Sequence, residues 1–149
     1  MSDESQGAMC DWSAADIVSA VRSCAVSPVE VTESVIGRIE QTEPVLNAFI
    51  TRCFDRALDQ ARRAERAIAN GQAARVLEGV PFSAKDLLNS EGVRTTFGSF
   101  AFENHVPADS CVAVQRLVDA GAILVGKTTT PEFGHKPLTE APLFGRTVN

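Results

Sequence analysis

The chain has 149 residues, 44% of them hydrophobic, and a formal net charge of -5. These values fit a folded domain with an apolar core and exclude a disordered chain. The acidic balance gives no basic surface for nucleic acid or an anionic membrane, and no apolar stretch approaches the roughly 20 residues that span a bilayer. Residues 1–11 are polar and carry no secretory signal, so we expect a cytoplasmic protein with no direct nucleic-acid or membrane partner.

The first half of the chain predicts helices. Residues 1–12 predict a disordered leader, and residues 13–76 predict a helical region. Two helix starts combine a serine with an acid three residues on, the pattern of a capping box. They are Ser13 with Asp16, and Ser27 with Pro28 and Glu30; we expect Pro44 to end the second helix. The predicted apolar stripes are Ile17, Val18, Val21, Cys24 and Ala25 for the first helix and Val31, Val35, Ile36 and Ile39 for the second.

A third helix is predicted over about residues 53–70, with Gly71 as its left-handed stop. Its apolar stripe is narrow and rich in alanine. We therefore expect this helix to lie against another helix and not deep in a core. The stripe is Phe54, Leu58, Ala61, Ala64 (or Glu65) and Ile68.

From residue 77 onward the pattern predicts strands. Residues 79–85 are apolar, with Pro81 near the strand start, and a polar loop follows over residues 86–96. A fourth helix begins after Asp109 or Ser110 and stops at Gly121, and residues 122–126 form an apolar run typical of a strand buried on both faces. The residues expected inside this helix are Val112, Val114, Leu117 and Val118.

Two strands joined through a helix make a βαβ crossover, so we predict an α/β fold whose α/β domain starts at residue 77 and continues through residue 149. A parallel pair leaves two open edges and needs further strands beside it. We therefore expect the sequence to be truncated within this domain.

Residues 121–128 match the phosphate-binding pattern G-x-x-x-x-G-K-[ST] letter for letter. A phosphate-binding loop follows a strand, opens a helix, and curls so that backbone N–H groups surround the phosphates. Here a predicted helix precedes the pattern, and the intervening residues are apolar and strand-forming. A nucleotide-binding module is thus an alternative that the local pattern opposes.

Lys85 is the principal candidate for chemistry. It ends an apolar strand, and ligands of open α/β sheets bind at the carboxyl ends of strands. Held among Val80, Phe82 and Ala84, its amine would lose hydration, which favours the neutral form that accepts a proton. One alternative is a lysine that extends into solvent. Another is a dyad with Ser83 on the same strand face, although the pair does not fit S-x-x-K.

Cysteines and histidines carry weaker signals. The four cysteines are widely spaced without a C-x-x-C pair, which predicts free thiols in a reducing compartment, with a catalytic cysteine as the alternative. His105 and His135 stand alone in loop-like stretches, whereas a metal site needs three or four ligands. We expect neither a metal nor a cofactor. The cysteines are Cys10, Cys24, Cys53 and Cys111.

Short motifs after residue 76 recur in a fixed order. They are LEGVPFSAKD (77–86), TFGS (96–99), AGA (120–122), GKT (126–128), PEF (131–133), TE (139–140) and GRTVN (145–149). Through this ordered set the chain resembles the amidase signature family over roughly residues 77–149, and the preceding helices fit that family's N-terminal region. One departure is Thr129, where many members have Asn.

This resemblance implies a large mixed-sheet α/β fold and a Ser–cis-Ser–Lys triad with Lys85 as the base. In that scheme Lys85 deprotonates a bridging serine, which activates a nucleophilic serine. The nucleophile attacks an amide carbonyl to form an acyl-enzyme, and backbone N–H groups stabilise the oxyanion. Both serines lie beyond the family's counterpart of Asn149, so we interpret the chain as an N-terminal fragment that hydrolyses no amide alone.

Several functions stay open at this point. One is an amide hydrolase acting on a small-molecule amide; another is the homologous subunit of a tRNA-dependent amidotransferase, which implies partner subunits. A non-catalytic amidase remnant is a third, and a homo-oligomer is equally open. The sequence names no substrate, because the family's acyl pocket lies largely after the catalytic serines.

Overall fold

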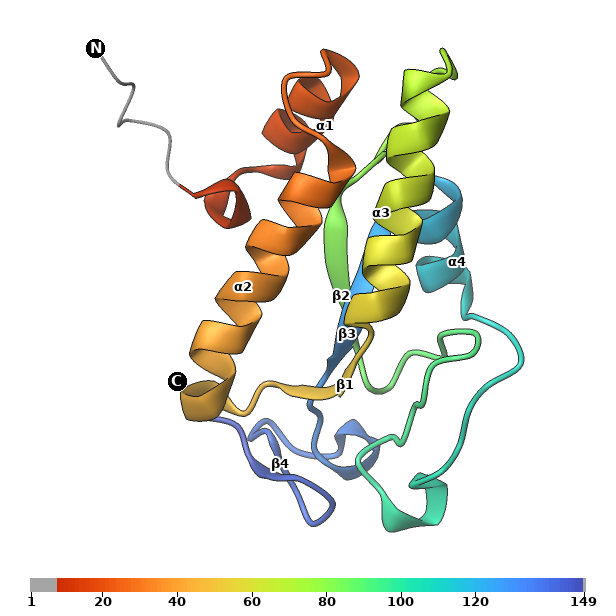
Figure 1. Ribbon diagram of the computed structural model, residues 1–149. Coiled ribbons are helices and arrows are strands. Elements are labelled where there is room, and N and C mark those ends of the chain that lie inside the picture. The colour runs from red at the N-terminus through yellow and green to blue at the C-terminus, as the bar shows by residue number, and fades with distance from the viewer. Residues whose placement is uncertain (1–7, 149) are drawn as a thin grey trace.

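The computed structural model describes residues 8–148 and shows a small mixed sheet with helices on both faces (Figure 1). The strand order is β1-β3-β2. β2 (Pro81–Lys85) runs parallel to the central β3 (Ile123–Thr128), and β1 (Phe49–Arg52) runs antiparallel to it. The α/β class and the βαβ unit are therefore confirmed.

Three buried clusters hold the layers together. The helices are α1 (Ala14–Arg22), α2 (Pro28–Leu46), α3 (Phe54–Ala69) and α4 (Val112–Asp119). One cluster joins α2 and α3 to Ile123 and Val125 of β3, and another joins α4 to Leu124 and Ala84 on the opposite face. The third packs α1 and α2 beside Val80, at the start of β2. None of the described helices is both long and apolar enough to cross a bilayer.

Ser13 and Ser27 cap the first two helices as predicted, but only the second helix has the predicted capping box. Ser13 Oγ accepts the N–H of Asp16 at 3.2 Å. Ser27 and Glu30 form a complete capping box, in which each side chain accepts the other residue's N–H, at 3.1 and 2.7 Å. Asp16 forms no such reciprocal bond, since its carboxylate accepts the Ser13 hydroxyl instead.

The predicted end of the second helix is wrong. α2 continues through Pro44 to Leu46 and ends at Asn47, whose φ of 51° is left-handed. A proline removes its own N–H donor, but the carbonyl of Glu43 still accepts the N–H of Asn47 and closes the last turn. The buried Glu43 carboxylate then accepts the N–H groups of Ala48 and Phe49, which turns the chain into β1.

The third helix ends as predicted, with Gly71 at a φ of 81°, but its predicted depth is wrong. Ala57 and Ala61 have no exposed surface and lie between α2 and β3. A stripe of alanines therefore marks close approach to the sheet here, because a small side chain lets the helix backbone come near its neighbour.

Two features of the first half were not foreseen. The strand β1 lies within the region predicted as wholly helical, and it pairs with β3; the division at residue 77 stays a prediction. The prediction of a disordered leader is wrong for Met9–Asp11, which form a 3-10 helix. This helix contacts α2: the Cys10 N–H donates to Ser34 Oγ, and Asp11 forms an ion pair with Arg38. The rest of the predicted leader, residues 1–7, lies outside the described residues.

In the second half, Pro81 opens β2 as predicted and Gly121 ends α4 with a φ of 100°. The predicted caps of α4 are wrong: the N-cap is Cys111, while Ser110 Oγ accepts the N–H of Glu91. Val112 is 67% exposed and not inside, because residues two apart in a helix lie on nearly opposite faces and Val114 is the buried one. The remaining short elements are the 3-10 helices η2 (Phe100–Phe102) and η3 (Glu132–Gly134), and the hairpin of β4 (Glu140–Ala141) and β5 (Gly145–Arg146).

Candidate active site

Lys85 is the last residue of β2, and its side chain is exposed. It forms no side-chain hydrogen bond or ion pair with the residues that the structure describes. Its place at the carboxyl end of a strand is confirmed, but the dry surroundings expected for its amine are not observed. Side chains alternate along a strand, so Ala84 points into the core beneath α4 while Lys85 points to the other face, on a strand at the sheet's edge.

Ser83 shares the exposed face with Lys85, as expected from their spacing. No hydrogen bond joins the two side chains within the described part of the chain. A dyad of these two residues therefore gains no support from the geometry, and its catalytic role stays untested.

Asp86, next to Lys85, points the opposite way and is 0% exposed. Its Oδ2 accepts the N–H of Thr96 at 2.9 Å and the Thr96 hydroxyl at 2.5 Å. Its Oδ1 has no hydrogen-bond partner in the described structure and lies 3.9 Å from the Lys127 Nζ. The residue after the candidate base thus ties the end of β2 to the following loop.

Lys127 is the buried counterpart of Lys85, at 0% exposure. Its Nζ donates to the carbonyl of Leu88 and, at 2.9 Å, to the Thr95 hydroxyl. Burial lowers the pKa of Lys127, and the nearby Asp86 carboxylate opposes that shift. Its ammonium therefore makes two hydrogen bonds and one ion pair to the segment after β2.

The phosphate-binding alternative is not supported by this geometry. Most of the matching pattern, Ile123–Thr128, is an extended strand paired on both sides and does not curl around an anion. The preceding helix and the strand-forming residues agree with the sequence analysis. Lys127, which a phosphate would need, faces Asp86 instead.

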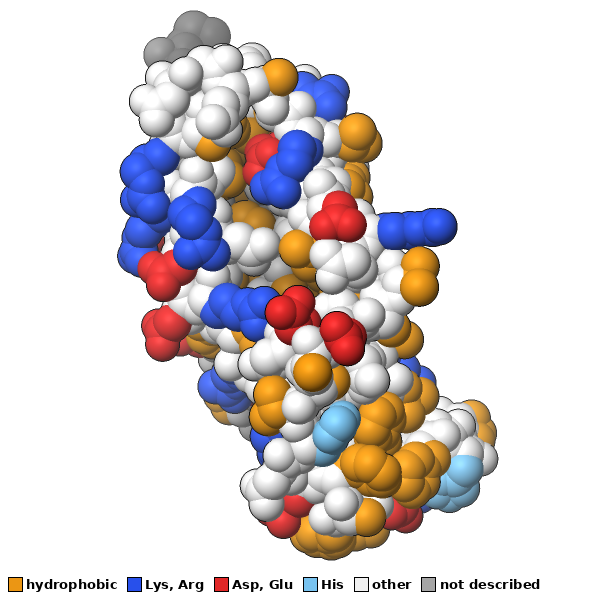
Figure 2. All heavy atoms as spheres, turned by 90° about the vertical axis from the view of Figure 1, so that its right-hand side faces the viewer, with side chains coloured by type: hydrophobic (Ala, Val, Ile, Leu, Met, Phe, Trp, Pro, Cys, Tyr) orange, Lys and Arg blue, Asp and Glu red, His pale blue; other side chains and the backbone are white. Residues whose placement is uncertain are grey.

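The loop held by Asp86 carries an exposed aromatic cluster. The ring of Phe97 lies 5.1 Å from that of Phe102, 5.9 Å from His105 and 6.3 Å from Phe133. Phe133 is 57% exposed, and hydrophobic side chains gather beside a histidine in the lower part of Figure 2. Gly98 allows the close approach to this cluster, since an added Cβ would lie 2.9 Å from the Thr130 carbonyl oxygen.

The other candidates do not assemble into a site. All four cysteines are free, and Cys53 and Cys111 are half-buried beside the cluster beneath α4. Burial raises the pKa of the Cys53 thiol, the opposite of what an activated cysteine needs. His105 stacks on Phe97, and His135 contacts the carbonyl of Glu132. Within residues 8–148 no three potential metal ligands group together.

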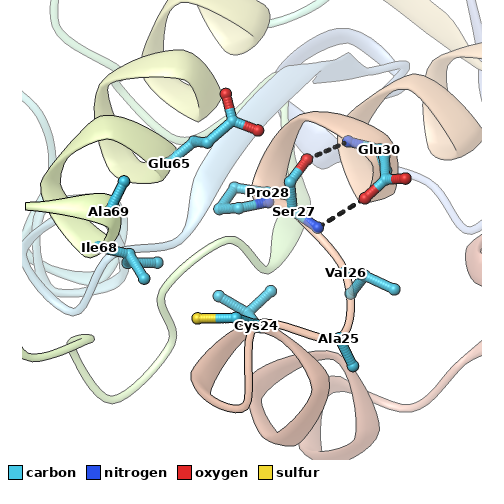
Figure 3. A pocket seen from close by; sticks show the side chains of 10 residues that line it. Cys24, Ala25, Val26, Ser27, Pro28, Glu30, Glu65, Ile68 and Ala69 are labelled. Atoms are coloured by element: carbon cyan, nitrogen blue, oxygen red, sulfur yellow. Dashed lines mark hydrogen bonds between the residues drawn. The ribbon is translucent and has the colours of Figure 1, made fainter.

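A pocket of about 260 Å³ lies at the other end of the sheet, between the α1–α2 turn and the last turn of α3 (Figure 3). Its lining includes Cys24, Val26, Pro28 and Ile68, next to the capping box of α2. The Cβ position of Gly79 lies 3.3 Å from Pro28, so this pocket neighbours the start of β2 and not its end. It therefore contributes nothing to the surroundings of Lys85.

The sequence analysis did not identify Asp86, Thr95 and Lys127 as one polar cluster. A signal was present: Lys127 follows an apolar run that was itself predicted to be buried on both faces. A buried ammonium needs acceptors and a counter-charge, and the polar loop after β2 was the nearest source of both.

Solved structures share the fold of this chain. A bacterial aryl acylamidase of the amidase signature family matches 93% of the chain, with 34% identity and a TM-score of 0.87, over 29% of its own length. Fatty acid amide hydrolase matches 95% of the chain with a TM-score of 0.89, but at 23% identity it shows the fold alone. The chain thus has the fold of one part of a class of α/β enzymes that cleave amides.

Sequence comparison gives the family. The chain belongs to the Amidase family, whose model matches residues 30–149. A glutamyl-tRNA(Gln) amidotransferase subunit of Geotalea daltonii is 45% identical over 124 residues, which is 83% of the chain and 25% of that relative. The chain therefore spans about a quarter of the length of this curated relative.

Proposed function

We propose that Lys85 is the general base of an amide-cleaving active site of the Ser–cis-Ser–Lys type, completed by sequence beyond residue 149. The supporting observation is a difference between two strand-end lysines. Lys85 is exposed at the edge of the sheet with no partner among the described residues, whereas the ammonium of Lys127 is engaged by Leu88, Thr95 and Asp86. Of these two lysines, only Lys85 has a side-chain nitrogen without a partner in the described structure.

In this proposal the neutral Lys85 amine takes a proton from a bridging serine, which takes the proton of the nucleophilic serine. The nucleophile attacks the amide carbonyl, the proton held by Lys85 returns through the bridging serine to the leaving amine, and water or ammonia then releases the acyl group. A base at pH 7 must be substantially neutral, which for lysine requires loss of hydration. We propose that the rest of the enzyme supplies this by covering the exposed face of Ser83 and Lys85.

The experiment uses a hybrid in which the matching segment of the bacterial aryl acylamidase is replaced by this chain. We expect the hybrid to hydrolyse an aryl acylamide and Lys85→Met to lower kcat by roughly 10²–10⁴-fold, the usual contribution of a general base. Lys136→Met, at an ion-paired lysine in the loop before β4, is the matched control and should keep its kcat. A near-normal kcat in Lys85→Met would remove Lys85 from the mechanism.

The 149-residue chain alone should hydrolyse no amide, because a base without its nucleophile forms no acyl-enzyme. Steady amide turnover by the purified chain that disappears in Lys85→Ala would contradict this. It would also direct attention to Ser83, which lies on the same face of β2.

A second candidate function is that of the amidase-like subunit of a tRNA-dependent amidotransferase. It is favoured by curated relatives named as glutamyl-tRNA(Gln) amidotransferase subunits, with 45% identity for that of Geotalea daltonii and 36% for that of Lachnospira eligens. Partner subunits would then be needed, and their genes beside this one would favour it over a free amidase. The small-molecule amide as substrate and the cytoplasmic location stay predictions.

A further inference from the structure

We propose that Lys127 is a positioning residue for Lys85: its buried ammonium holds together the segments that fix the backbone at the end of β2. This inference rests on the proposed role of Lys85 as base. The observation behind it is a set of contacts made by one side chain on β3 with two separate stretches after β2.

The first step is the joining of these stretches. Lys127 Nζ donates to the carbonyl of Leu88, in the turn that follows β2, and to the hydroxyl of Thr95, seven residues further on. Thr95 has no exposed surface, and its N–H donates to the carbonyl of His105. One ammonium thus links β3 to the turn after β2 and to Thr95, which precedes the aromatic cluster in the sequence.

The second step is charge. Asp86 is wholly buried, and its Oδ1 has no hydrogen-bond partner in the described structure. Lys127 Nζ, at 3.9 Å, is its salt-bridge partner. Removing one member of a buried ion pair leaves the other uncompensated, so the position of Asp86 depends on Lys127.

The third step is how this reaches Lys85. Leu88 N–H donates to the Lys85 carbonyl, and Asp86 N–H donates to the Thr128 carbonyl, both at 2.9 Å. In the ladder, Lys85 pairs with Thr128 and Ala84 with Lys127. The backbone of Lys85 is therefore bracketed by groups that Lys127 holds, while its side chain stays free.

A register shift explains why Lys127 reaches this side of the sheet. Strict alternation would place it with Ile123 and Val125, toward α2 and α3. The pairing with β2 skips Val125, so Lys127 pairs with Ala84, whose side chain packs beneath α4. Such irregularities re-aim a side chain, and this one directs an ammonium at Asp86.

The test uses the composition of the chain, which contains only three lysines, Lys85, Lys127 and Lys136. In the 149-residue chain labelled with ¹³C at the lysine ε-carbon, NMR should show three signals, assigned by single substitutions. We expect Lys127→Met to shift the Lys85 signal, and the Leu88 and Thr96 amide protons to exchange about tenfold faster or more. A tenfold change corresponds to about 1.4 kcal/mol of lost protection.

Lys136→Met is the matched control and should leave the Lys85 signal in place. If Lys127→Met does not fold, Asp86→Asn gives the same test with the charge removed from the other partner. An unchanged Lys85 signal and unchanged Leu88 exchange in a folded Lys127→Met or Asp86→Asn chain would overturn the inference.

Activity gives a second readout that separates this inference from the proposed function. In the active hybrid, Lys127→Met should lower kcat with little change in KM, because substrate binding does not involve the buried ammonium. If Lys85→Met leaves kcat unaffected while the Lys85 signal still depends on Lys127, the proposed function fails and the structural coupling stands. If Lys85→Met abolishes turnover and Lys127→Met leaves kcat unchanged, the positioning role fails alone.

Discussion

β2 and β3 end side by side, and each carries a lysine near that end, but the two lysines have opposite surroundings. Lys85 lies in solvent with no partner among the described residues. Lys127, one step away in the ladder, is fully buried against Asp86, Thr95 and Leu88. Both follow apolar runs in the sequence, so the run itself does not distinguish a structural lysine from a reactive one.

The difference lies in what the next segment supplies. The loop after β2 provides a carboxylate, a hydroxyl and a carbonyl to the face that Lys127 reaches through its register shift. The other face, where Lys85 points, receives no such group from the described chain. The Lys127 ammonium thus joins parts of the fold, whereas the Lys85 side chain joins none of the described parts.

The largest expected effect follows from breaking the buried pair. Lys127→Met should lower the free energy of unfolding by about 3–5 kcal/mol, because Asp86 is left as an uncompensated buried charge. Lys85→Met should change it by less than about 0.5 kcal/mol, as for an exposed residue without contacts. Urea unfolding of the two variants measures the difference, and equal losses would mean that the two lysines are not separated as described.

A smaller effect tests the close packing of β1 against β3, next to Lys127. A Cβ at Gly126 would lie 2.7 Å from the Thr51 carbonyl oxygen and 2.9 Å from the Phe49 ring. Gly126→Ala should therefore destabilise the chain by about 1–3 kcal/mol, the range for overpacking, and loosen the pairing of β1 with β3. Gly37→Ala, in α2 with no atom within 4 Å of its Cβ position, is the control and should not destabilise. A neutral Gly126→Ala would contradict the close packing of β1.

The features that the sequence predicted correctly are those determined by residues close together in the chain. Ser27, Pro28 and Glu30 define a helix start within four positions, and the observed capping box has the predicted partners. The apolar run before Lys127 predicted a buried strand correctly, because the run is also made of residues that are neighbours in the sequence. Lys85 was likewise placed correctly at a strand end.

The parts that could not be read arise from contacts far apart in sequence. β1 is only four residues long and becomes a strand through its pairing with β3, more than 70 residues later. The exposure of Lys85 follows from its place on an edge strand, which local alternation does not specify. The Asp86–Lys127 pair depends on a register shift that no periodicity in the sequence announces.

Two hydroxyl groups, one in contact with Lys127 and one beside Lys85, extend the comparison of the two lysines to smaller expected effects. Thr95→Val removes one acceptor of the buried ammonium and should cost about 1–2 kcal/mol, since a hydrogen bond to a charged group is lost. Ser83→Ala, on the exposed face with Lys85, should stay within about 0.5 kcal/mol. Thermal or urea unfolding distinguishes the two, and a Thr95→Val variant as stable as Ser83→Ala would show that Lys127 does not depend on this contact.

The smallest expected effect is a dependence of the free energy of unfolding on pH in the alkaline range, caused by Lys127. Burial lowers the pKa of Lys127, and Asp86 offsets this only in part. Between the folded-state value and the ordinary unfolded value of about 10.4, the unfolded chain binds more protons, so the free energy of unfolding rises with pH. Burial raises the pKa of the Cys53 thiol, so that group contributes a fall with pH and opposes the rise.

The two contributions are separated by measuring urea unfolding from about pH 8 to pH 11 in a Cys53→Ala background, which removes the contribution of that thiol. Adding Lys127→Met should remove the rise with pH, because methionine carries no proton in either state. Adding Lys136→Met instead should leave it, since that lysine is a surface residue paired with Glu140. A slope that survives Lys127→Met would assign the alkaline dependence to another group and would weaken the contrast between the two strand ends, because a buried ammonium must be linked to folding through its proton.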